Sequence, residues 1–482
     1  MIPTLLVIAF ALDQAAHERS AREAEQAVAA LVDGARAQQC VRELVALGPR
    51  MGGTPSGDKS AEYIAARLSA LGLDVRIVDD PKKSAWQPLK WKLSASRVGS
   101  DEPQVEFARA WPWQHSPDGE GVLELLSVPR EGAALITARL ARPRRANDGS
   151  SSKPVADPSS TVPLVLVDGS TTLDGSWPLP HELARGTQQL CFGLARSEGE
   201  LLRGWLASGA KVRVAYQLDA EEREASPKTV VARLPGRAGG DAWKQSYLLF
   251  CAHGDSDSGG PGADDNASGI ATVIEIATAW KKAIDAKLLP QPAHEVRFAV
   301  WGSEIFSTDD YVERALASDG ELLGVINFDQ SGFGSGADQV NVEPDDLPAN
   351  IALVNTLVAV MREHAPKDAA EPGAFPARWA TNKSLGGTDS YCFSDSKYCR
   401  DKLRPAVTVF TSAWGRPDEH KKTAGMPGES WSERDVVSVD YDLYYHSAGD
   451  TPENTTDKEP WNMAWCARVG LLGAARYLES LP

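Results

Sequence analysis

The sequence is poor in cysteine, has no long hydrophobic run and lacks an excess of positive charge. Its six cysteines among 482 residues include no C-x-x-C pair, which excludes the usual cysteine-based zinc sites. Beyond its first residues no segment is apolar enough to be transmembrane, so we expect no integral membrane segment. The formal net charge of −16 would repel phosphate backbones, so we expect no nucleic-acid partner.

A targeting signal is indicated at the N-terminus. Residues 1–12 form a short apolar run, and residues 9–11 have the small-x-small pattern of a cleavage site, although no Lys or Arg precedes the run. We interpret residues 1–16 as a signal-like segment and expect export to a periplasmic or extracellular compartment. There Cys392 and Cys399, which flank a polar loop, could close a short disulfide.

The composition and the order of apolar patterns predict the domain organisation. With 42% hydrophobic and 24% charged residues, the chain can bury more than one core. Residues 20–83 are predicted to form two helices and a strand, residues 84–222 to form short strands, and residues 223–482 to alternate strands and helices. The predicted fold class is therefore α/β, with a mostly parallel central sheet flanked by helices and an inserted, mainly β domain.

Three polar residues follow predicted strands of this sheet: His253 after 247–252, Glu304 after 295–301 and Asp329 after 322–328. In open parallel sheets, functional groups collect beyond the carboxyl ends of the strands. Asp255 lies two residues after His253, close enough to fix the tautomer of its ring. These positions predict a shared site at one edge of the sheet.

A tight turn rich in Gly and Ala at residues 261–269 contains Asp265. Such a turn can hold this carboxylate between two cations, because small residues let the backbone approach closely. A helix N-terminus whose acidic residues counter the helix dipole would have a similar sequence. We expect Asp265 to be a bridging ligand and Asp264 to hydrogen-bond the turn.

A second imidazole, His446, lies near the C-terminal end of the chain. Asp450, four residues further on, is a plausible carboxylate to orient its ring. Tyr445 could direct its phenol at a developing oxyanion, or it is a buried aromatic residue. Two imidazoles together with carboxylates are the ligands that a pair of divalent cations requires.

Five segments together resemble the co-catalytic dizinc aminopeptidases, the family of bacterial leucyl aminopeptidases and glutamate carboxypeptidases. They are His253-Gly-Asp255-Ser256, Gly262-Ala-Asp-Asp265-Asn-Ala-Ser-Gly269, Trp301-Gly-Ser-Glu304, Asn327-Phe-Asp329 and Tyr445-His446-Ser-Ala-Gly-Asp450-Thr-Pro. Their order and spacing match over residues 229–482. Residues 84–222 are similar, more weakly, to the protease-associated domain often inserted in this family.

The resemblance implies a ligand set and catalytic residues. One zinc would take His253, Asp265 and Asp329, and a second, weaker site would take Asp265, His446 and a glutamate. Glu304, Asp255 and Tyr445 would be the catalytic residues, with Asp255 and Asp450 supporting the ligands. Residues 387–390 and the loop after Phe410, with Trp414 and Trp431, would shape the pocket for a peptide substrate.

One feature departs from the family pattern of two adjacent glutamates, a general base and a ligand. Ser303 precedes Glu304, and Ile305 follows it. If Glu304 is the base, the second metal has two protein ligands, with Asp309 or Asp310 as substitutes. If Glu304 is the ligand, which the apolar Ile305 favours, Ser303 replaces the base, and a missing base costs about 10²–10⁴-fold in rate.

The function predicted from the resemblance is a zinc exopeptidase, an aminopeptidase that removes N-terminal residues from peptides with a water activated by the metals. One alternative is a catalytically impaired homologue that acts as a metal-containing binding protein. Another, an aminoacyl-transfer or cyclising enzyme with a single zinc, would leave His253 and Asp329 without a role. The oligomeric state stays open.

Overall fold

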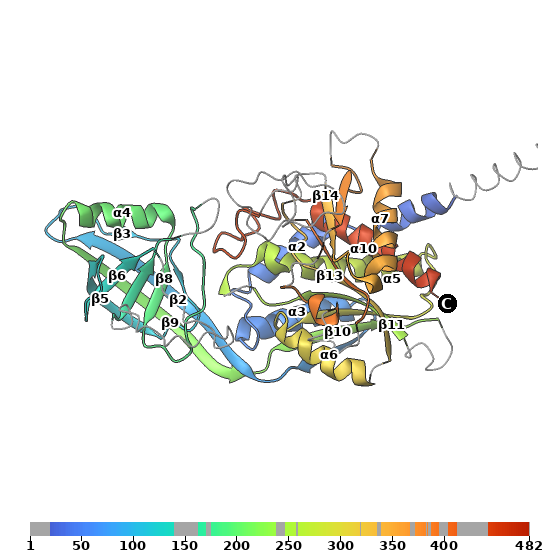
Figure 1. The fold of residues 1–482 in the computed structure, drawn as a ribbon, viewed down its shortest axis with the longest axis horizontal. Coiled ribbons are helices and arrows are strands. Elements are labelled where there is room, and N and C mark those ends of the chain that lie inside the picture. The colour runs from blue at the N-terminus through green and yellow to red at the C-terminus, as the bar shows by residue number, and fades with distance from the viewer. Residues whose placement is uncertain are drawn as a thin grey trace, which may run out of the picture.

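The computed structural model places a larger α/β lobe beside a smaller β-rich lobe (Figure 1). It describes residues 20–138, 162–169, 175–237, 246–256, 259–318, 320–334, 339–366, 372–381, 383, 387–394, 403–411 and 442–481. The signal-like segment, Cys399, Trp414 and Trp431 lie outside these residues. Among the described helices, none is long and apolar enough to cross a membrane.

The larger lobe is built on an eight-stranded sheet in the order β1-β10-β12-β11-β13-β16-β14-β15. Its strands are β1 (Asp74–Asp79), β10 (Lys228–Leu234), β11 (Ser246–His253), β12 (Glu295–Trp301), β13 (Glu321–Phe328), β14 (Gln339–Glu343), β15 (Arg378–Thr381) and β16 (Ala406–Phe410). The four central strands β12, β11, β13 and β16 are parallel, whereas β1, β10 and β14 pair antiparallel to a neighbour. The predicted α/β class is confirmed, with antiparallel pairs near the edges.

The central strands are apolar throughout because both faces of the sheet are covered. Along β11, Leu248, Phe250 and Ala252 enter the core on one face, and Tyr247 and Leu249 enter the core on the other. This alternation follows from the two-residue period of a strand.

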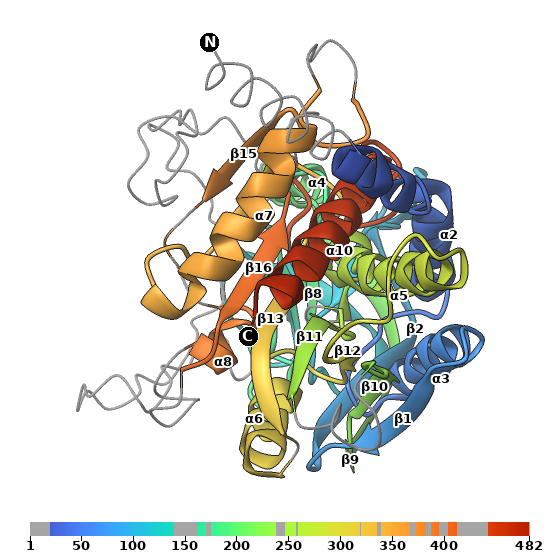
Figure 2. The same cartoon turned by 90° about the vertical axis from the view of Figure 1, so that its right-hand side faces the viewer.

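Helices close both faces of the sheet. The larger core lies under α2 (Gly34–Val45), α3 (Pro55–Ser69), α5 (Gly269–Asp285), α7 (Ile351–His364) and α10 (Asn462–Ser480), several of which lie across the sheet in Figure 2. The opposite face packs against α6 (Phe306–Ser318) and α8 (Tyr391–Ser394). A π-turn, η4 (Ala263–Ser268), precedes α5, and a 3-10 turn, η5 (Pro348–Asn350), precedes α7.

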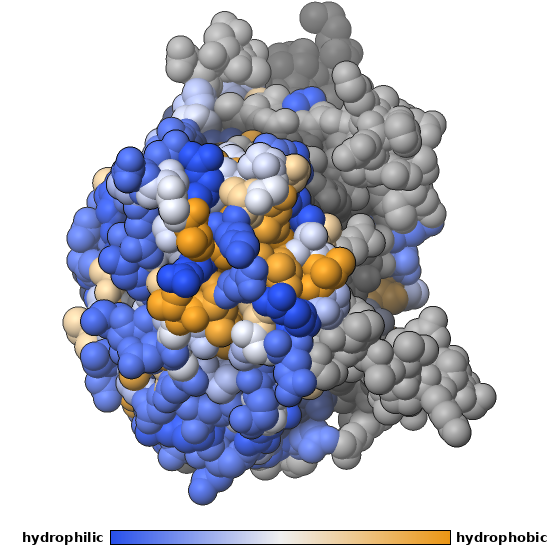
Figure 3. All heavy atoms as spheres, turned by 90° about the vertical axis from the view of Figure 1, so that its left-hand side faces the viewer, coloured by the Kyte–Doolittle hydropathy of each residue, from blue (hydrophilic) through white to orange (hydrophobic). Residues whose placement is uncertain are grey.

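The smaller lobe is a second eight-stranded sheet in the order β3-β2-β9-β5-β6-β7-β8-β4. Its elements are β2 (Lys83–Arg97), β3 (Val105–Glu106), β4 (Trp111–Pro112), β5 (Gly119–Leu126), β6 (Ala134–Thr137), β7 (Leu164–Val167), β8 (Leu190–Gly193), α4 (Arg196–Ala207) and β9 (Val212–Ala225). The lobe has its own hydrophobic core, which includes Phe192, Leu202 and Val214. Seen end-on, its surface is mostly hydrophilic around a small group of apolar side chains (Figure 3).

The long pair β2 and β9 differs from the short strands predicted for this region. The two strands pair antiparallel over nearly their whole length and run from the smaller lobe to the larger one (Figure 1). The register shifts between Pro88 and Lys90, where β2 has one extra residue, so β2 does not keep a constant alternation of buried and exposed residues. The prediction of strands relied on a two-residue period. Because this period is interrupted in β2, the sequence did not indicate a single long strand there.

Candidate metal centre

The predicted site residues gather where the parallel strands end. His253 is the last residue of β11, Asp329 directly follows β13, and Glu304 lies three residues beyond β12. Asp265 comes from η4, the turn before α5. The carboxyl edge of the sheet thus brings together side chains from four separate segments.

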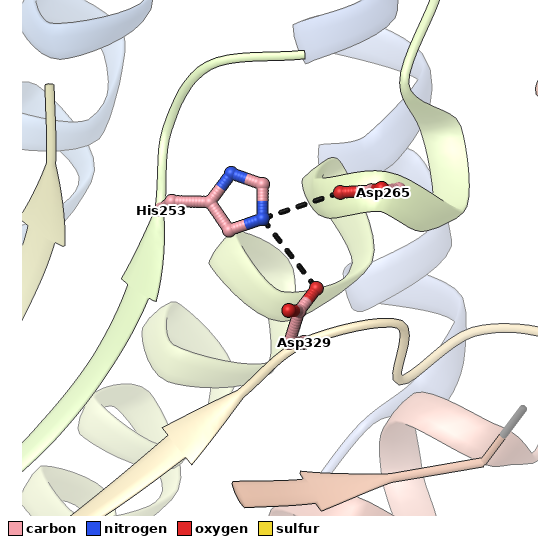
Figure 4. Close-up of side chains that lie close together, drawn as sticks. All are labelled: His253, Asp265 and Asp329. Carbon is pink, nitrogen blue, oxygen red and sulfur yellow. Dashed lines mark ion pairs between the residues drawn. The ribbon is translucent and has the colours of Figure 1, made fainter. Parts of the chain in front are cut away.

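Three of these residues form a compact group (Figure 4). His253 Nε2 lies 3.2 Å from Asp265 Oδ1 and 3.4 Å from Asp329 Oδ1. One potential ligand atom from each residue lies within 4.8 Å of the other two, and all three side chains are buried. A buried imidazole facing two carboxylates is a suitable donor set for a divalent cation.

Asp265 also reaches the second imidazole. Its other oxygen, Oδ2, lies 3.0 Å from Nε2 of His446, a half-buried side chain. Each carboxylate oxygen of Asp265 therefore faces a different histidine, which is the arrangement that a bridging ligand requires. Burial opposes the charged form of Asp265, but hydrogen bonds with His253 and His446 more than offset it and lower its pKa.

Other side chains hold the first group in place. Nδ1 of His253 lies 3.3 Å from Asp255 Oδ1, so the ring presents Nε2 to the carboxylates. Thr388 Oγ1 donates to Asp329 Oδ2 at 2.8 Å. These contacts fix the orientation of two predicted ligands.

Asp450 occupies a different position from the one we expected. Its Oδ1 accepts the backbone N–H of Asp264 at 2.8 Å, and its Oδ2 accepts that of Asp265 at 3.0 Å. It therefore supports the turn that carries the bridging residue, because a carboxylate inside a tight loop can satisfy backbone donors of a distant segment. Its role toward the ring of His446 stays a prediction.

Asp264 bonds a neighbouring loop, since its Oδ1 accepts the N–H of Gly332 at 2.7 Å. Tyr445 stacks on His446 with ring centroids 3.7 Å apart, and its role toward an oxyanion stays a prediction. Asp310, considered as a substitute ligand, accepts from Arg314 Nε at 2.6 Å within α6.

Glu304 lies beside the group of three. Its backbone N–H donates to Asp255 Oδ1 at 2.8 Å. Burial raises the pKa of its carboxyl well above the usual range; His253 opposes this rise, and the negative charges of Asp329, Asp389 and Asp265 add to it. The carboxyl of Glu304 is therefore close enough to interact electrostatically with the predicted ligands His253, Asp265 and Asp329.

The site carries more buried acid than its positive groups can balance. Burial raises the pKa of Asp389 to about 6 and that of Asp450 to about 7. For His253, burial disfavours the charge, but Glu304 and hydrogen bonds to neighbouring carboxylates outweigh it and raise the pKa. Shifts of this kind mark a place where a cation would relieve repulsion between carboxylates.

The backbone is also unusual at these positions. Among the described non-glycine residues, five have positive φ, and three of them are Ile305 (56°), Gln330 (54°) and His446 (50°). The first two directly follow Glu304 and Asp329. Left-handed backbone at side-chain-bearing residues costs free energy and is concentrated at functional sites.

Arg50 was missed by sequence analysis. It is fully buried, and its guanidinium donates to the carbonyls of Pro261 at 3.0 Å and Gly262 at 2.6 Å. Burial lowers its pKa to about 10, although Asp450, Asp255 and Asp265 favour the charge. No local pattern signals this role, since Arg50 follows a helix-ending Gly-Pro pair.

The donor atoms fit a divalent cation such as zinc. Among the described residues, His253 Nε2 and Asp329 Oδ1 are buried and face each other at 3.4 Å without a hydrogen bond of good geometry. Buried polar atoms are almost always satisfied, so two unsatisfied ligand-type atoms that face one another indicate a missing partner. A cation would satisfy both and compensate the carboxylates.

An α/β sheet with an imidazole–carboxylate group at its carboxyl edge is an arrangement suited to a metal-binding protein. Residues 229–469, half of the chain, match the model of peptidase family M28. The chain belongs to peptidase family M28, as the resemblance in its motifs implied.

Individual relatives agree with this assignment. A leucine aminopeptidase of Trichophyton equinum is 29% identical over 272 residues, which cover 54% of this chain and 47% of the relative. This chain therefore spans about half the length of that curated relative.

Solved structures share the fold. A peptidase M28 precursor of Shewanella amazonensis has a TM-score of 0.61 at 18% identity, covering 96% of this chain and 97% of its own. A zinc aminopeptidase of Bacillus subtilis has a TM-score of 0.56 at 15% identity, covering 92% and 95%.

Proposed function

We propose that this chain is a zinc-dependent aminopeptidase that removes N-terminal residues from peptides. Membership of peptidase family M28 supports peptide hydrolysis, and the aminopeptidase names of its relatives support action at the N-terminus. The observation that carries the proposal is Asp265, whose two oxygens face His253 at 3.2 Å and His446 at 3.0 Å.

The ligands divide into two sets that share Asp265. One zinc would be held by His253, Asp265 and Asp329, and the other by Asp265, His446 and Glu304. Zinc at such a site supplies Lewis-acid polarisation of the scissile carbonyl and makes water a nucleophile near neutral pH. We assign Glu304 as a ligand because Ile305, which packs partly buried against the apolar core under α6, then fills the apolar position that follows the glutamate pair of the family pattern.

The remaining residues orient this centre. Asp255 holds the Nδ1 side of His253, Thr388 holds Asp329, and Asp450 holds the backbone of Asp265. Tyr445, next to His446, would donate its phenol hydrogen to the oxyanion that develops on the peptide carbonyl. Each role depends on position, so a shift of about 1 Å would lower the rate strongly.

Zinc-dependent turnover tests the proposal. The purified chain is expected to contain zinc, to hydrolyse amino-acyl anilides, to lose activity with a chelator and to regain it with zinc. Asp265→Asn should abolish both zinc binding and turnover, because the neutral amide cannot compensate two cations. Asp285→Asn, an exposed residue at the end of α5, is the matched control and should keep both.

Two outcomes would contradict the proposal in different ways. A normally folded chain with only a trace of zinc would refute the metal centre. Full zinc content without turnover on any amino-acyl anilide or peptide would favour the catalytically impaired homologue.

We also propose that the smaller lobe is a protease-associated-like insert that borders the substrate site. The carbonyl of Pro178 accepts the N–H of Ala448 at 3.0 Å, two residues from His446. Trp177 packs on Gly449, where a Cβ would lie 2.5 Å from the indole. Substitution Gly449→Ala should therefore displace the lobe from the His446 loop.

Export is a separate part of the proposal and rests on the apolar run at residues 1–12. Fractionation of cells that produce the chain from its own start would test it: the mature protein should appear outside the cytoplasm and begin near residue 12. Retention of the run in a cytoplasmic protein would contradict it.

A further inference from the structure

A continuous line of hydrogen bonds joins the smaller lobe to a predicted metal ligand. Lys83, the first residue of β2, donates from Nζ to Ser303 Oγ at 2.8 Å. Ser303 Oγ lies 3.1 Å from Asp255 Oδ2, and Asp255 Oδ1 lies 3.3 Å from His253 Nδ1. Four side chains from three segments therefore form one polar chain.

The chemistry of these groups fixes the direction of every bond. A lysine ammonium has only donors and a carboxylate has only acceptors. Ser303 must therefore accept from Lys83 and donate its single proton to Asp255. Asp255 in turn accepts from His253 Nδ1, through its carboxylate at 3.3 Å and its backbone carbonyl at 3.1 Å, so Nε2 is the ring nitrogen that would bind a cation beside Asp265 and Asp329.

Ser303 contributes a neutral hydroxyl beside Asp255, backed by the ammonium group of Lys83. Ser303 is only 2% exposed, so solvent cannot freely replace the partners of its hydroxyl. Ser303 and Lys83 therefore act together on Asp255.

Lys83 is held in place on the Ser303 side. Its Nζ lies 5.1 Å from the centre of the Phe306 ring, at the start of α6, within the range of a cation–π contact. Its backbone pairs with Ala225 in β9, and Ala225 packs close to Gly53 of the larger lobe. The preceding residue, Lys82, is exposed.

We propose that Lys83 is a positioning residue of the metal centre, which acts through Ser303 and Asp255 to set the orientation and tautomer of His253. It thereby raises the affinity of the site for its divalent cation and couples the smaller lobe to the centre. The inference rests on the proposed function for the identity of the cation as zinc.

Zinc affinity of the full chain, measured by competition with a chromophoric chelator, tests the inference without any substrate. Residues that orient a metal-bound histidine typically contribute about 10–100-fold in metal affinity. Lys83→Met should weaken binding by about 10-fold, and Ser303→Ala should do the same. Because Lys83 acts through Ser303, the double variant should bind no more weakly than either single variant.

Four controls separate positioning from a general loss of structure. Lys82→Met should keep the affinity of the unaltered chain, and Lys83→Arg, which retains a donor, should recover most of it. Cobalt substituted for zinc should change its visible absorption in Lys83→Met but not in Lys82→Met, because only a change at the ligands alters that spectrum. Denaturation midpoints measured with a chelator check that each variant is folded.

The outcomes are distinct. Unchanged zinc affinity in Lys83→Met, or losses in the two single variants that multiply in the double variant, would overturn the inference alone. Failure of the unaltered chain to bind zinc would overturn the proposed function as well. If the unaltered chain binds zinc but hydrolyses no peptide, the proposed function fails, and a 10-fold loss of zinc affinity in Lys83→Met still supports the inference.

Discussion

At the scale of single residues, Glu304 decides how many cations the proposed centre would hold. The first proposed cation would have three ligands, His253, Asp265 and Asp329, which form a compact buried group. The second would have Asp265 and His446, joined by Glu304 if that residue is a ligand. Ser303 and Ile305 flank Glu304, so no adjacent carboxylate can share the roles of ligand and base.

Replacing Glu304 by Gln is expected to remove one zinc equivalent. The neutral amide is a poor zinc ligand, so the content should fall from about two equivalents per chain to about one, with a corresponding loss of activity. Metal analysis of the purified variant measures this, and Glu321→Gln at an exposed position is the control. Two retained equivalents with lost turnover would assign Glu304 as the base instead.

At the scale of secondary structure, the elements nearest the site were the most predictable. The strand expected at 295–301 is β12, Glu295–Trp301, and those expected at 247–252 and 322–328 each differ from the observed strand by at most one residue at either end. These strands are buried on both faces, so their apolar runs are continuous and bounded by polar residues.

Contacts between distant segments could not be predicted in the same way. Asp450 bonds the backbone of Asp265, 185 residues earlier, and Lys83 bonds Ser303, 220 residues later. Local spacing carries no information about such partners. The positions of the predicted ligands could be inferred from the sequence because the strand ends of a parallel sheet must meet at one edge.

Glu25 connects three helices at the back of the larger lobe. It lies in the helical stretch 20–29, accepts from Arg476 of α10 at 2.6 and 2.7 Å, and lies 2.8 Å from His364 Nε2 of α7. Burial opposes its charge, but hydrogen bonds from His364 and Arg476 more than offset this and lower its pKa from 4.5 to about 2.

Glu25→Gln is therefore expected to destabilise the fold in a pH-dependent way. A depressed carboxyl pKa adds stability above the unfolded pKa, and this contribution is lost as the pH falls from about 4.5 to about 2. After discounting for partial solvent screening, we expect about 1–2 kcal/mol near neutral pH. Denaturant titrations at several pH values measure it, with exposed Glu23→Gln as the control; a difference that does not shrink in acid would contradict the ion-pair explanation.

At the scale of the whole molecule, negative charge is both abundant and concentrated. The chain carries a net charge of −16, and several of its acidic side chains are buried around the predicted metal centre. Asp264, Asp265, Asp329, Asp389, Asp442 and Asp450 are each at most 5% exposed. Arg50 is the fully buried guanidinium that faces these groups, so folding the larger lobe without a cation leaves carboxylates uncompensated.

Removing the metal should therefore destabilise the larger lobe and spare the smaller one. A ligand that binds only the folded state stabilises it by about 4 kcal/mol at a free concentration about 1,000 times its Kd. We expect a chelator to lower the Tm of the larger lobe by several degrees, measured by calorimetry. The smaller lobe has its own core and should give a transition that does not move.

In Asp265→Asn the chelator should have no effect, because that variant cannot hold the cations. An equal shift in Asp265→Asn and the unaltered chain would mean that the stabilising metal binds elsewhere.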